Sequence, residues 1–155
     1  MTLAQIKKSD LIEQTLRFQG KPLSFRNYPL SRQIIDTEAD FYLLKGGRQI
    51  AKSVTLANVI LSDIMAYPYN SFLYIAPTLP QVKVFSADRI AARIEESPDF
   101  KDIYLDKTMA SVPFEQNIFK KTFANGSQIY FRSETQLDSI RGIAVKQNMF
   151  DEIQD

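Results

Sequence analysis

The stretch Gly46-Gly47-Arg48-Gln49-Ile50-Ala51-Lys52-Ser53 follows the apolar run 41–44 and precedes a segment of helical periodicity. A strand, a glycine-containing loop and a helix in this order are typical of a phosphate-binding loop, whose pattern is Gly, four residues, Gly, Lys and Ser or Thr. The chain departs from the pattern only at the second glycine, where alanine is tolerated if the backbone φ is negative. The stretch therefore predicts an α/β fold with a phosphate site, and a plain turn between strand and helix is the alternative.

Each part of this loop has a chemical reason. The backbone N–H groups of 46–51 can surround phosphate oxygens, and the N-terminus of the following helix favours negative charge. Lys52 adds a positive charge, and the hydroxyl of Ser53 is a suitable ligand for Mg²⁺. We therefore predict that residues 46–53 bind a nucleoside triphosphate together with Mg²⁺.

An acidic pair, Asp151-Glu152, follows the run 145–150 near the other end of the chain. This run resembles a Walker B strand, in which a buried strand ends in an Asp that holds the magnesium shell, followed by a Glu that orients and deprotonates water. The polar residues 146–148 make the run only half apolar, so an exposed acidic turn is the other interpretation. With the loop 46–53 upstream we favour the strand, with Asp151 as a metal ligand and Glu152 as the catalytic carboxylate.

The composition excludes several kinds of chemistry. The 155 residues include no His and no Cys, so imidazole bases, thiolate nucleophiles, Cys/His zinc sites and disulfides are excluded. Phosphoryl transfer remains compatible, since it uses metal, Lys, Arg and carboxylates. A hydrophobic content of 45% and a net charge of +1 are ordinary for one globular domain. No apolar tract is long enough to span a membrane and no signal peptide is evident, so we expect a cytoplasmic protein without membrane contact.

The rest of the chain alternates helical and extended patterns, which predicts a mainly parallel sheet with a β-hairpin and helices on both faces. Thr78 is expected to cap one helix, and the dipeptide Asn125-Gly126 is the strongest hairpin signal, since both residues accept positive φ. Asp10 and Glu13 are spaced like a capping pair. The expected elements are a helix within 3–16, a short helix 31–36, a strand 41–44, a helix 52–66, a strand 72–76, a helix 80–97 with a solvated face at Arg89, Arg93, Glu95 and Glu96, hairpin strands 117–124 and 127–132, and a strand 145–150.

Taken together, the motifs resemble the start of the ATPase domain of terminase large subunits, the DNA-packaging motors of tailed bacteriophages. The resemblance covers about residues 25 to 155, and the order and spacing of its parts carry it. Those parts are the phosphate loop with Gly47-Arg48-Gln49 and Lys52-Ser53, the strand end Ala76-Pro77-Thr78, the hairpin Asn125-Gly126-Ser127, and Ser139-Ile140-Arg141-Gly142 shortly before Asp151-Glu152.

The resemblance implies ATP as the nucleotide, with Lys52 and Ser53 on triphosphate and magnesium, Asp151 on the magnesium shell and Glu152 as catalytic carboxylate. It further implies Arg48 as a sensor or finger near the γ-phosphate and Gln33 near adenine. Residues 1–30 would form an accessory helix and loop, and 31–155 the first portion of the ATPase domain. The implied partners are double-stranded DNA, a small terminase subunit, a portal and further copies of the chain in a ring.

The sequence also departs from this family. Terminase large subunits continue with a coupling motif, further strands and a nuclease domain, so we expect this chain to be a piece of a larger ATPase, with turnover depending on the remainder. Two other interpretations stay open. One is a superfamily 2 helicase-like or phage-defence ATPase, which shares the Lys-Ser loop, the Ala-Pro-Thr strand end and the Asp-Glu pair. The other is a non-enzymatic interaction module with a vestigial loop.

Overall fold

The computed structural model describes residues 6–38, 52–105, 119–140 and 144–151. The predicted strand 41–44, the loop 46–51 and Glu152 lie outside these ranges. The described elements are, in chain order, α1 Lys8–Thr15, β1 Arg17–Phe18, β2 Lys21–Pro22, α2 Pro29–Asp36, α3 Lys52–Ala66, β3 Ser71–Ala76, α4 Leu79–Val84, the π-helix η1 Phe85–Ala91, α5 Ala92–Glu95, α6 Pro98–Tyr104, β4 Lys120–Thr122, β5 Gln128–Ser133, the 3-10 helix η2 Glu134–Ile140 and β6 Gln147–Phe150.

Four of the strands form one mixed sheet in the order β4-β5-β3-β6. Strand β3 is parallel to both of its neighbours, whereas β4 is antiparallel to β5. Tyr74 of β3 lies in register with Phe131 of β5 on one side and with Met149 of β6 on the other. The expected α/β class is confirmed at this level, and β3, β5 and β6 all end at the same edge of the sheet.

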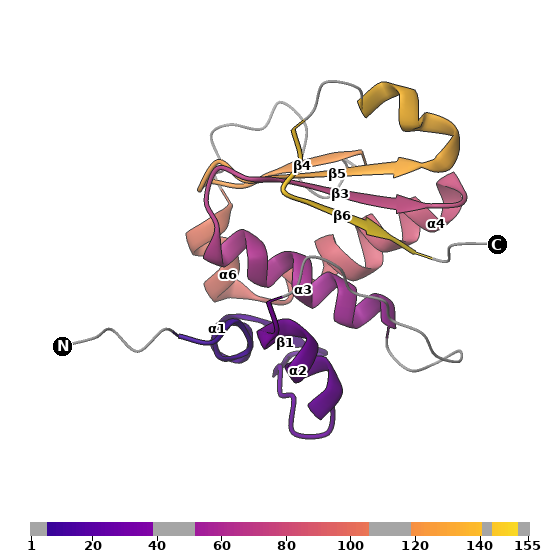
Figure 1. The fold of residues 1–155 in the computed structure, drawn as a ribbon. Coiled ribbons are helices and arrows are strands. Elements are labelled where there is room, and N and C mark those ends of the chain that lie inside the picture. The colour runs from indigo at the N-terminus through magenta and orange to yellow at the C-terminus, as the bar shows by residue number, and fades with distance from the viewer. Residues whose placement is uncertain (1–5, 39–51, 106–118, 141–143, 152–155) are drawn as a thin grey trace.

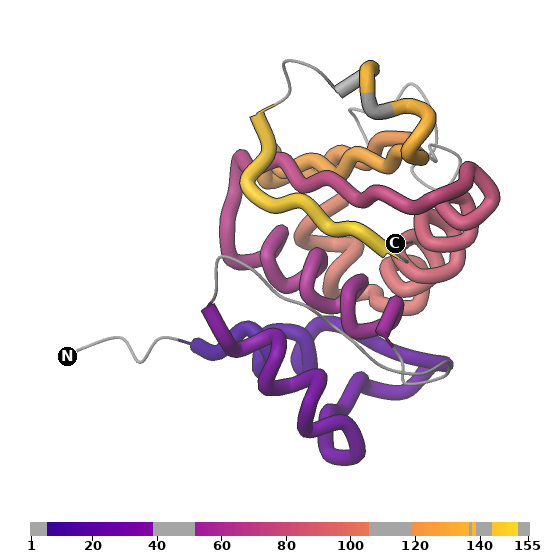
Figure 2. Tube along the Cα trace, turned by 45° about the vertical axis from the view of Figure 1, so that its right-hand side comes forward, coloured from indigo at the N-terminus to yellow at the C-terminus, as the bar shows by residue number. Residues whose placement is uncertain are grey.

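The α-helices of the described residues gather on one face of the sheet. Helix α3 and the helical segment 79–104 cover this face, and α1 and α2 pack on the outer side of α3 (Figure 1). Of the helices in the described part of the chain, only the 3-10 helix η2 lies on the opposite side (Figures 1 and 2). The expectation of helices on both faces is met there by this single 3-10 helix. The alternation along β5 accounts for this uneven covering of the two faces. Ile129 and Phe131 are buried in the core on the face that the α-helices cover. The residues on the other face are only half-buried, namely Gln128, Tyr130 and Arg132.

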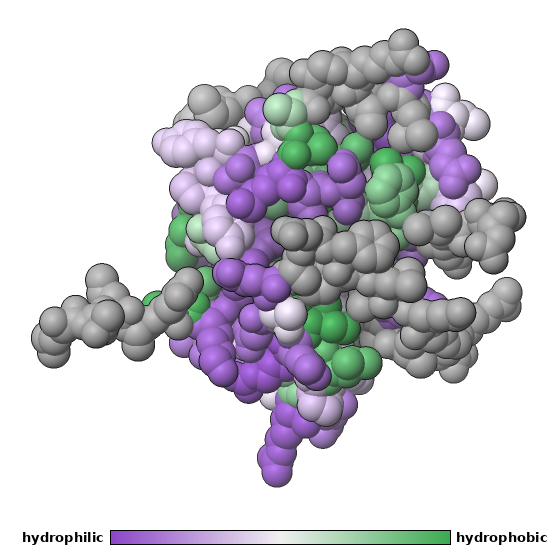
Figure 3. Space-filling model, in the orientation of Figure 1, coloured by the Kyte–Doolittle hydropathy of each residue, from purple (hydrophilic) through white to green (hydrophobic). Residues whose placement is uncertain are grey.

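The core lies between β3 and the helices. Phe72, Tyr74 and Ala76 point from β3 into the main hydrophobic cluster, which also includes Ile12 of α1 and Ile60 of α3. Each large apolar side chain buried in this way contributes about 1.5–3 kcal/mol. Helix α1 therefore shares the core of the sheet domain. On the face seen in Figure 3, hydrophilic residues cover most of the described surface and the hydrophobic areas are small and separate.

The helix after β3 runs close to its predicted range but is not regular throughout. Thr78 precedes α4 as its N-cap, and its backbone N–H donates to the side chain of Gln81 at 3.1 Å, as in a capping box. The middle of the segment is the π-helix η1. The expected solvated face is wrong at Arg93, which is 6% exposed and donates to the carbonyl of Arg17 at 3.0 Å. Its guanidinium also lies over the ring of Phe18. Arg93 therefore holds in place the hairpin of β1 and β2, which we call the N-terminal hairpin.

The predicted hairpin and N-terminal helix form, with two corrections of detail. Strands β4 and β5 pair as expected, but only Gly126 has positive φ, at 80°. Asn125 acts through its side chain, which accepts from the Ser127 N–H and donates to the carbonyl of Ile64 at 2.7 Å. The capping pair is wrong because α1 already begins at Lys8. Asp10 instead pairs with Arg32, and Glu13 accepts from the Phe25 N–H.

The observed bounds of α3, β3 and β6 can be compared with the predicted ones, and these three elements frame the site. Helix α3 has the predicted range, and the strands at 71–76 and 147–150 appear where β-structure was expected. In β6 only Met149 is buried, which accounts for the polar residues that precede it.

Within the described residues, no helix is long and apolar enough to cross a bilayer.

Candidate functional site

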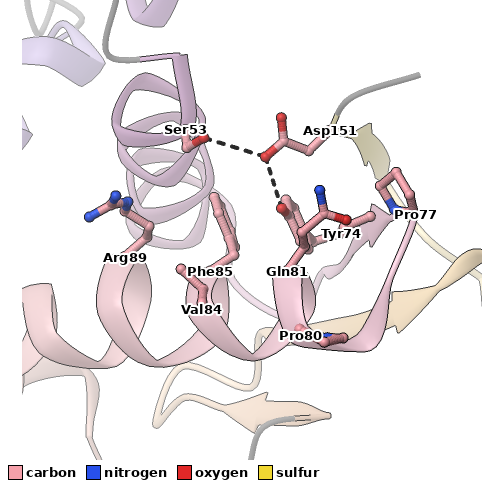
Figure 4. A pocket seen from close by; sticks show the side chains of 10 residues that line it. Ser53, Tyr74, Pro77, Pro80, Gln81, Val84, Phe85, Arg89 and Asp151 are labelled. Atoms are coloured by element: carbon pink, nitrogen blue, oxygen red, sulfur yellow. Dashed lines mark hydrogen bonds between the residues drawn. The ribbon is translucent and has the colours of Figure 1, made fainter. Parts of the chain in front are cut away.

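The site lies where the first turn of α3 meets the ends of β3 and β6. Ser53 is the second residue of α3, and Asp151 follows directly after β6. The Ser53 hydroxyl lies 3.4 Å from Oδ2 of Asp151, although 98 positions separate the two residues in the chain. Figure 4 shows the two side chains facing each other across the gap between helix and sheet. The fold therefore brings together the two residues that the sequence predicted as metal ligands.

Asp151 is held in this place by both its backbone and its side chain. Its N–H donates to the carbonyl of Ile75 at 2.9 Å, which extends the parallel pairing of β3 and β6 by one residue. The hydroxyl of Tyr74 donates to Oδ2 of Asp151 at 2.9 Å. Both hydroxyls thus bind the same carboxylate oxygen, and within the described residues Oδ1 accepts no hydrogen bond (Figure 4).

A pocket of about 280 Å³ opens beside this pair. One wall is the segment 76–89, which contributes apolar surface from Val84 and Phe85 and polar groups from Gln81 and Arg89. Arg89 lies at the opposite end of the pocket from Pro77 (Figure 4). Its guanidinium is half-buried and makes no hydrogen bond or ion pair with the described part of the chain. The pocket thus offers a carboxylate, a hydroxyl and a cation around an apolar wall.

The polar partners of Asp151 in the described part of the chain are uncharged. Among the described residues, this carboxylate makes no ion pair, and its hydrogen-bond donors are two neutral hydroxyls and no charged group. Mg²⁺ prefers oxygen ligands at about 2.1 Å and often keeps several waters. The hydroxyl of Ser53 and the carboxylate of Asp151, whose Oδ2 lies 3.4 Å from that hydroxyl, are close enough for both side chains to contribute to one such shell. Within the described ranges, no group of three or more acidic, His or Cys side chains gathers, either at this site or elsewhere.

The remaining predicted site residues are distributed as follows. Lys52 is the first residue of α3, next to Ser53. Gln33 is exposed on α2 and does not line the pocket. The other predicted nucleotide-binding residues, Gly46, Gly47, Arg48, Gln49, Ile50 and Ala51, and the predicted catalytic Glu152, lie outside the described residues.

The sequence reasoning missed Tyr74 and Arg89. Tyr74 was counted only as one residue of an apolar run, yet it is the one member of that run with a polar end. A side chain two positions before the strand end points to the same face as Ala76, so its hydroxyl could have been expected near the ligand edge. Arg89 was assigned to a solvated helix face, and nothing in its spacing distinguishes it from its neighbours.

Comparison with protein-family models returned no match, and comparison with curated proteins returned none either. The functional assignment therefore depends on the geometry of Ser53, Asp151 and the pocket, together with the motifs of the sequence.

Proposed function

We propose that this chain binds a nucleoside triphosphate with Mg²⁺ and carries the hydrolytic site of a P-loop ATPase. The observation that supports this most strongly is the approach of Ser53 to Asp151 at 3.4 Å. The sequence patterns assign these two residues, which lie 98 positions apart in the chain, to the two halves of one magnesium site. A chance glycine turn and a chance acidic turn would have no reason to meet at one point of the fold.

The roles follow from the chemistry of each group. Lys52 and the loop before it neutralise the phosphates, and Ser53 and Asp151 hold the metal, which supplies charge neutralisation at the phosphates. Glu152, next to Asp151, aligns and deprotonates the attacking water. Arg48 is the predicted cation near the γ-phosphate. The half-buried guanidinium of Arg89 is a second cation available to an anion in the pocket.

The biological setting that we propose is DNA packaging by a terminase large subunit. The support is the order of the motifs, including the hairpin Asn125-Gly126-Ser127, which the structure has between β4 and β5. Double-stranded DNA, a small terminase subunit, a portal and a ring of identical copies are the partners that belong to this setting. The nucleotide in such a motor is ATP.

A calorimetric titration with a matched control tests the proposal. ATP is titrated into the chain with Mg²⁺ and, separately, with EDTA, for the parent, Asp151→Asn and Asp102→Asn. Asp102 is exposed on α6 and does not line the pocket, so it controls for the loss of one negative charge. We expect Asp151→Asn to abolish most of the gain in affinity that Mg²⁺ provides, and Asp102→Asn to retain it. Equal behaviour of the two variants, or no ATP binding by the parent, would overturn the proposal.

A further inference from the structure

The shorter of the two side-chain hydrogen bonds to Asp151 involves a residue to which the motifs assign no role. Tyr74 is 1% exposed, and its hydroxyl donates to Oδ2 of Asp151 at 2.9 Å. This distance is shorter than the 3.4 Å between Ser53 and the same oxygen. The phenol is therefore the main side-chain restraint on the Asp151 carboxylate.

The ring of Tyr74 is itself held in place. It stacks on Phe85 with centroids 3.8 Å apart and an interplanar angle of 4°, and Phe131 lies against it at 6.2 Å. A stacked ring in a close-packed core keeps one orientation. The hydroxyl consequently occupies a fixed point between the pocket wall and the end of β6.

This fixed donor determines which carboxylate oxygen is available. Oδ2 of Asp151 is engaged by Tyr74 and Ser53, while Oδ1 accepts no hydrogen bond in the described part of the chain (Figure 4). Outer partners of a metal ligand orient it, and their loss typically lowers metal affinity by about 10-fold to 100-fold. Without the phenol, the carboxylate can rotate about its side-chain bonds and adopt several orientations.

We propose that Tyr74 is a positioning residue for the metal site: its hydroxyl fixes the Asp151 carboxylate so that Oδ1 faces a divalent cation. This inference rests on the proposed function, since it assigns a cation to Asp151. It adds a residue outside the loop and the acidic pair, and it links the metal site to η1 through the stack on Phe85.

Tyr74→Phe is the decisive variant, because it removes one oxygen and retains the ring and its stack. Tyr130→Phe is the matched control: Tyr130 lies on the neighbouring strand β5, and its hydroxyl donates to Gln128 at 2.6 Å, outside the pocket. For both variants and for Asp151→Asn, the affinity for Mn²⁺ is measured by electron paramagnetic resonance in the presence of ATP. The affinity for ATP in EDTA is measured in parallel.

We expect Tyr74→Phe to weaken Mn²⁺ binding about tenfold, at the lower end of the range for outer partners of a ligand, with ATP affinity in EDTA unchanged. Tyr130→Phe should match the parent in both. If Asp151→Asn weakens Mn²⁺ binding while Tyr74→Phe does not, the positioning role is wrong and the proposed function stands. If Asp151→Asn has no effect, the proposed function itself fails. An equal loss in Mn²⁺ and in EDTA would mean that Tyr74 only supports the fold, which also overturns the inference.

Discussion

One aspartate lies near each end of helix α3, Asp63 in its last turn and Asp151 of the β6 end beside its first turn, and the two carboxylates have different partners. Near the C-terminal end, Asp63 is buried and receives the ammonium of Lys8 at 2.7 Å. The ring of Tyr67 lies beneath Lys8 and Lys146, at 4.9 and 4.0 Å from their ammonium groups. Near the N-terminal end, Asp151 receives two hydroxyls and, within the described residues, no cation.

This difference supports the proposal that Asp63 has a structural role and that Asp151 binds a ligand. A carboxylate removed from water requires a compensating charge or several hydrogen bonds. The chain supplies that charge to Asp63 from its own α1, which anchors this helix to α3. At Asp151 the described residues supply no such charge, and this carboxylate lies beside a pocket and at the end of parallel strands, where α/β folds bind ligands.

The largest effect that we predict is on ATP hydrolysis at the proposed site, which includes the first turn of α3. In a protein that carries a complete ATPase domain, Glu152→Gln retains the size of the side chain but removes the base, so hydrolysis should slow by roughly 10² to 10⁴ while Mg-ATP binding is unchanged. Single-turnover release of labelled phosphate, with protein in excess over ATP, measures both rates. A variant that hydrolyses at the parental rate would show that the acidic pair is an ordinary turn.

The second prediction concerns the stability of the fold and the ion pair of Lys8 with Asp63, near the C-terminal end of α3. Lys8→Met leaves the carboxylate of Asp63 without its counter-ion and should lower the free energy of unfolding by about 3 kcal/mol near pH 7, the lower end for a broken buried pair because Lys8 is 20% exposed. Burial raises the pKa of Asp63 above its ordinary value, and the hydrogen bond and charge of Lys8 only partly offset this. Without Lys8 the pKa of the folded state rises further.

The sign of the pH dependence follows from that shift. A folded-state pKa above the unfolded value means that the native state binds the extra proton, so stability is present at acid pH and is lost as pH rises through the folded pKa. The destabilisation of Lys8→Met should therefore be smaller near pH 4.5 than at pH 7 in urea unfolding. Lys101→Met is the control: its exposed pair with Glu95 should cost at most about 1 kcal/mol. A pH-independent loss would contradict the account of Asp63.

The third prediction concerns the binding of Mg-ATP at the first turn of α3. Lys52→Ala removes the only side-chain cation that the phosphate-loop pattern requires, and Mg-ATP affinity should fall at least tenfold, or about 1.4 kcal/mol. The matched variant is Lys83→Ala, since Lys83 is exposed on α4 and does not line the pocket. Unchanged affinity of Lys52→Ala in titration calorimetry would refute the phosphate-loop assignment.

The sequence predicted best the features that depend on local pattern. The range of α3 follows from its apolar periodicity and from the proline after it, and β3 follows from a short apolar run bounded by turn residues. The pairing of Ser53 with Asp151 could be anticipated only because a known motif relates loop and strand end.

The features that were missed depend on tertiary contacts. The burial of Arg93 results from a carbonyl of the N-terminal hairpin, 76 positions away, which no helical pattern contains. The role of Tyr74 depends on the register that brings β6 beside β3. Asn125 uses its side chain instead of positive φ because α3 offers a carbonyl within reach. In each case a partner distant in the chain determines what a side chain does.

The smallest effect that we predict is for Asp63→Asn, and it tests the comparison most directly. The amide retains an oxygen that can accept from Lys8, and the side chain of Lys8 keeps 20% of its surface in solvent, so its ammonium can be rehydrated. Because burial disfavours the charged form of Asp63, removal of that charge should change the free energy of unfolding by less than about 1 kcal/mol at pH 7. Mg-ATP binding should equal that of the parent, in contrast to Asp151→Asn. Parallel calorimetric and urea titrations of the two amide variants give the answer: if Asp63→Asn also impaired magnesium-dependent binding, the two ends of α3 would not be separable into a structural carboxylate and a ligand-binding one.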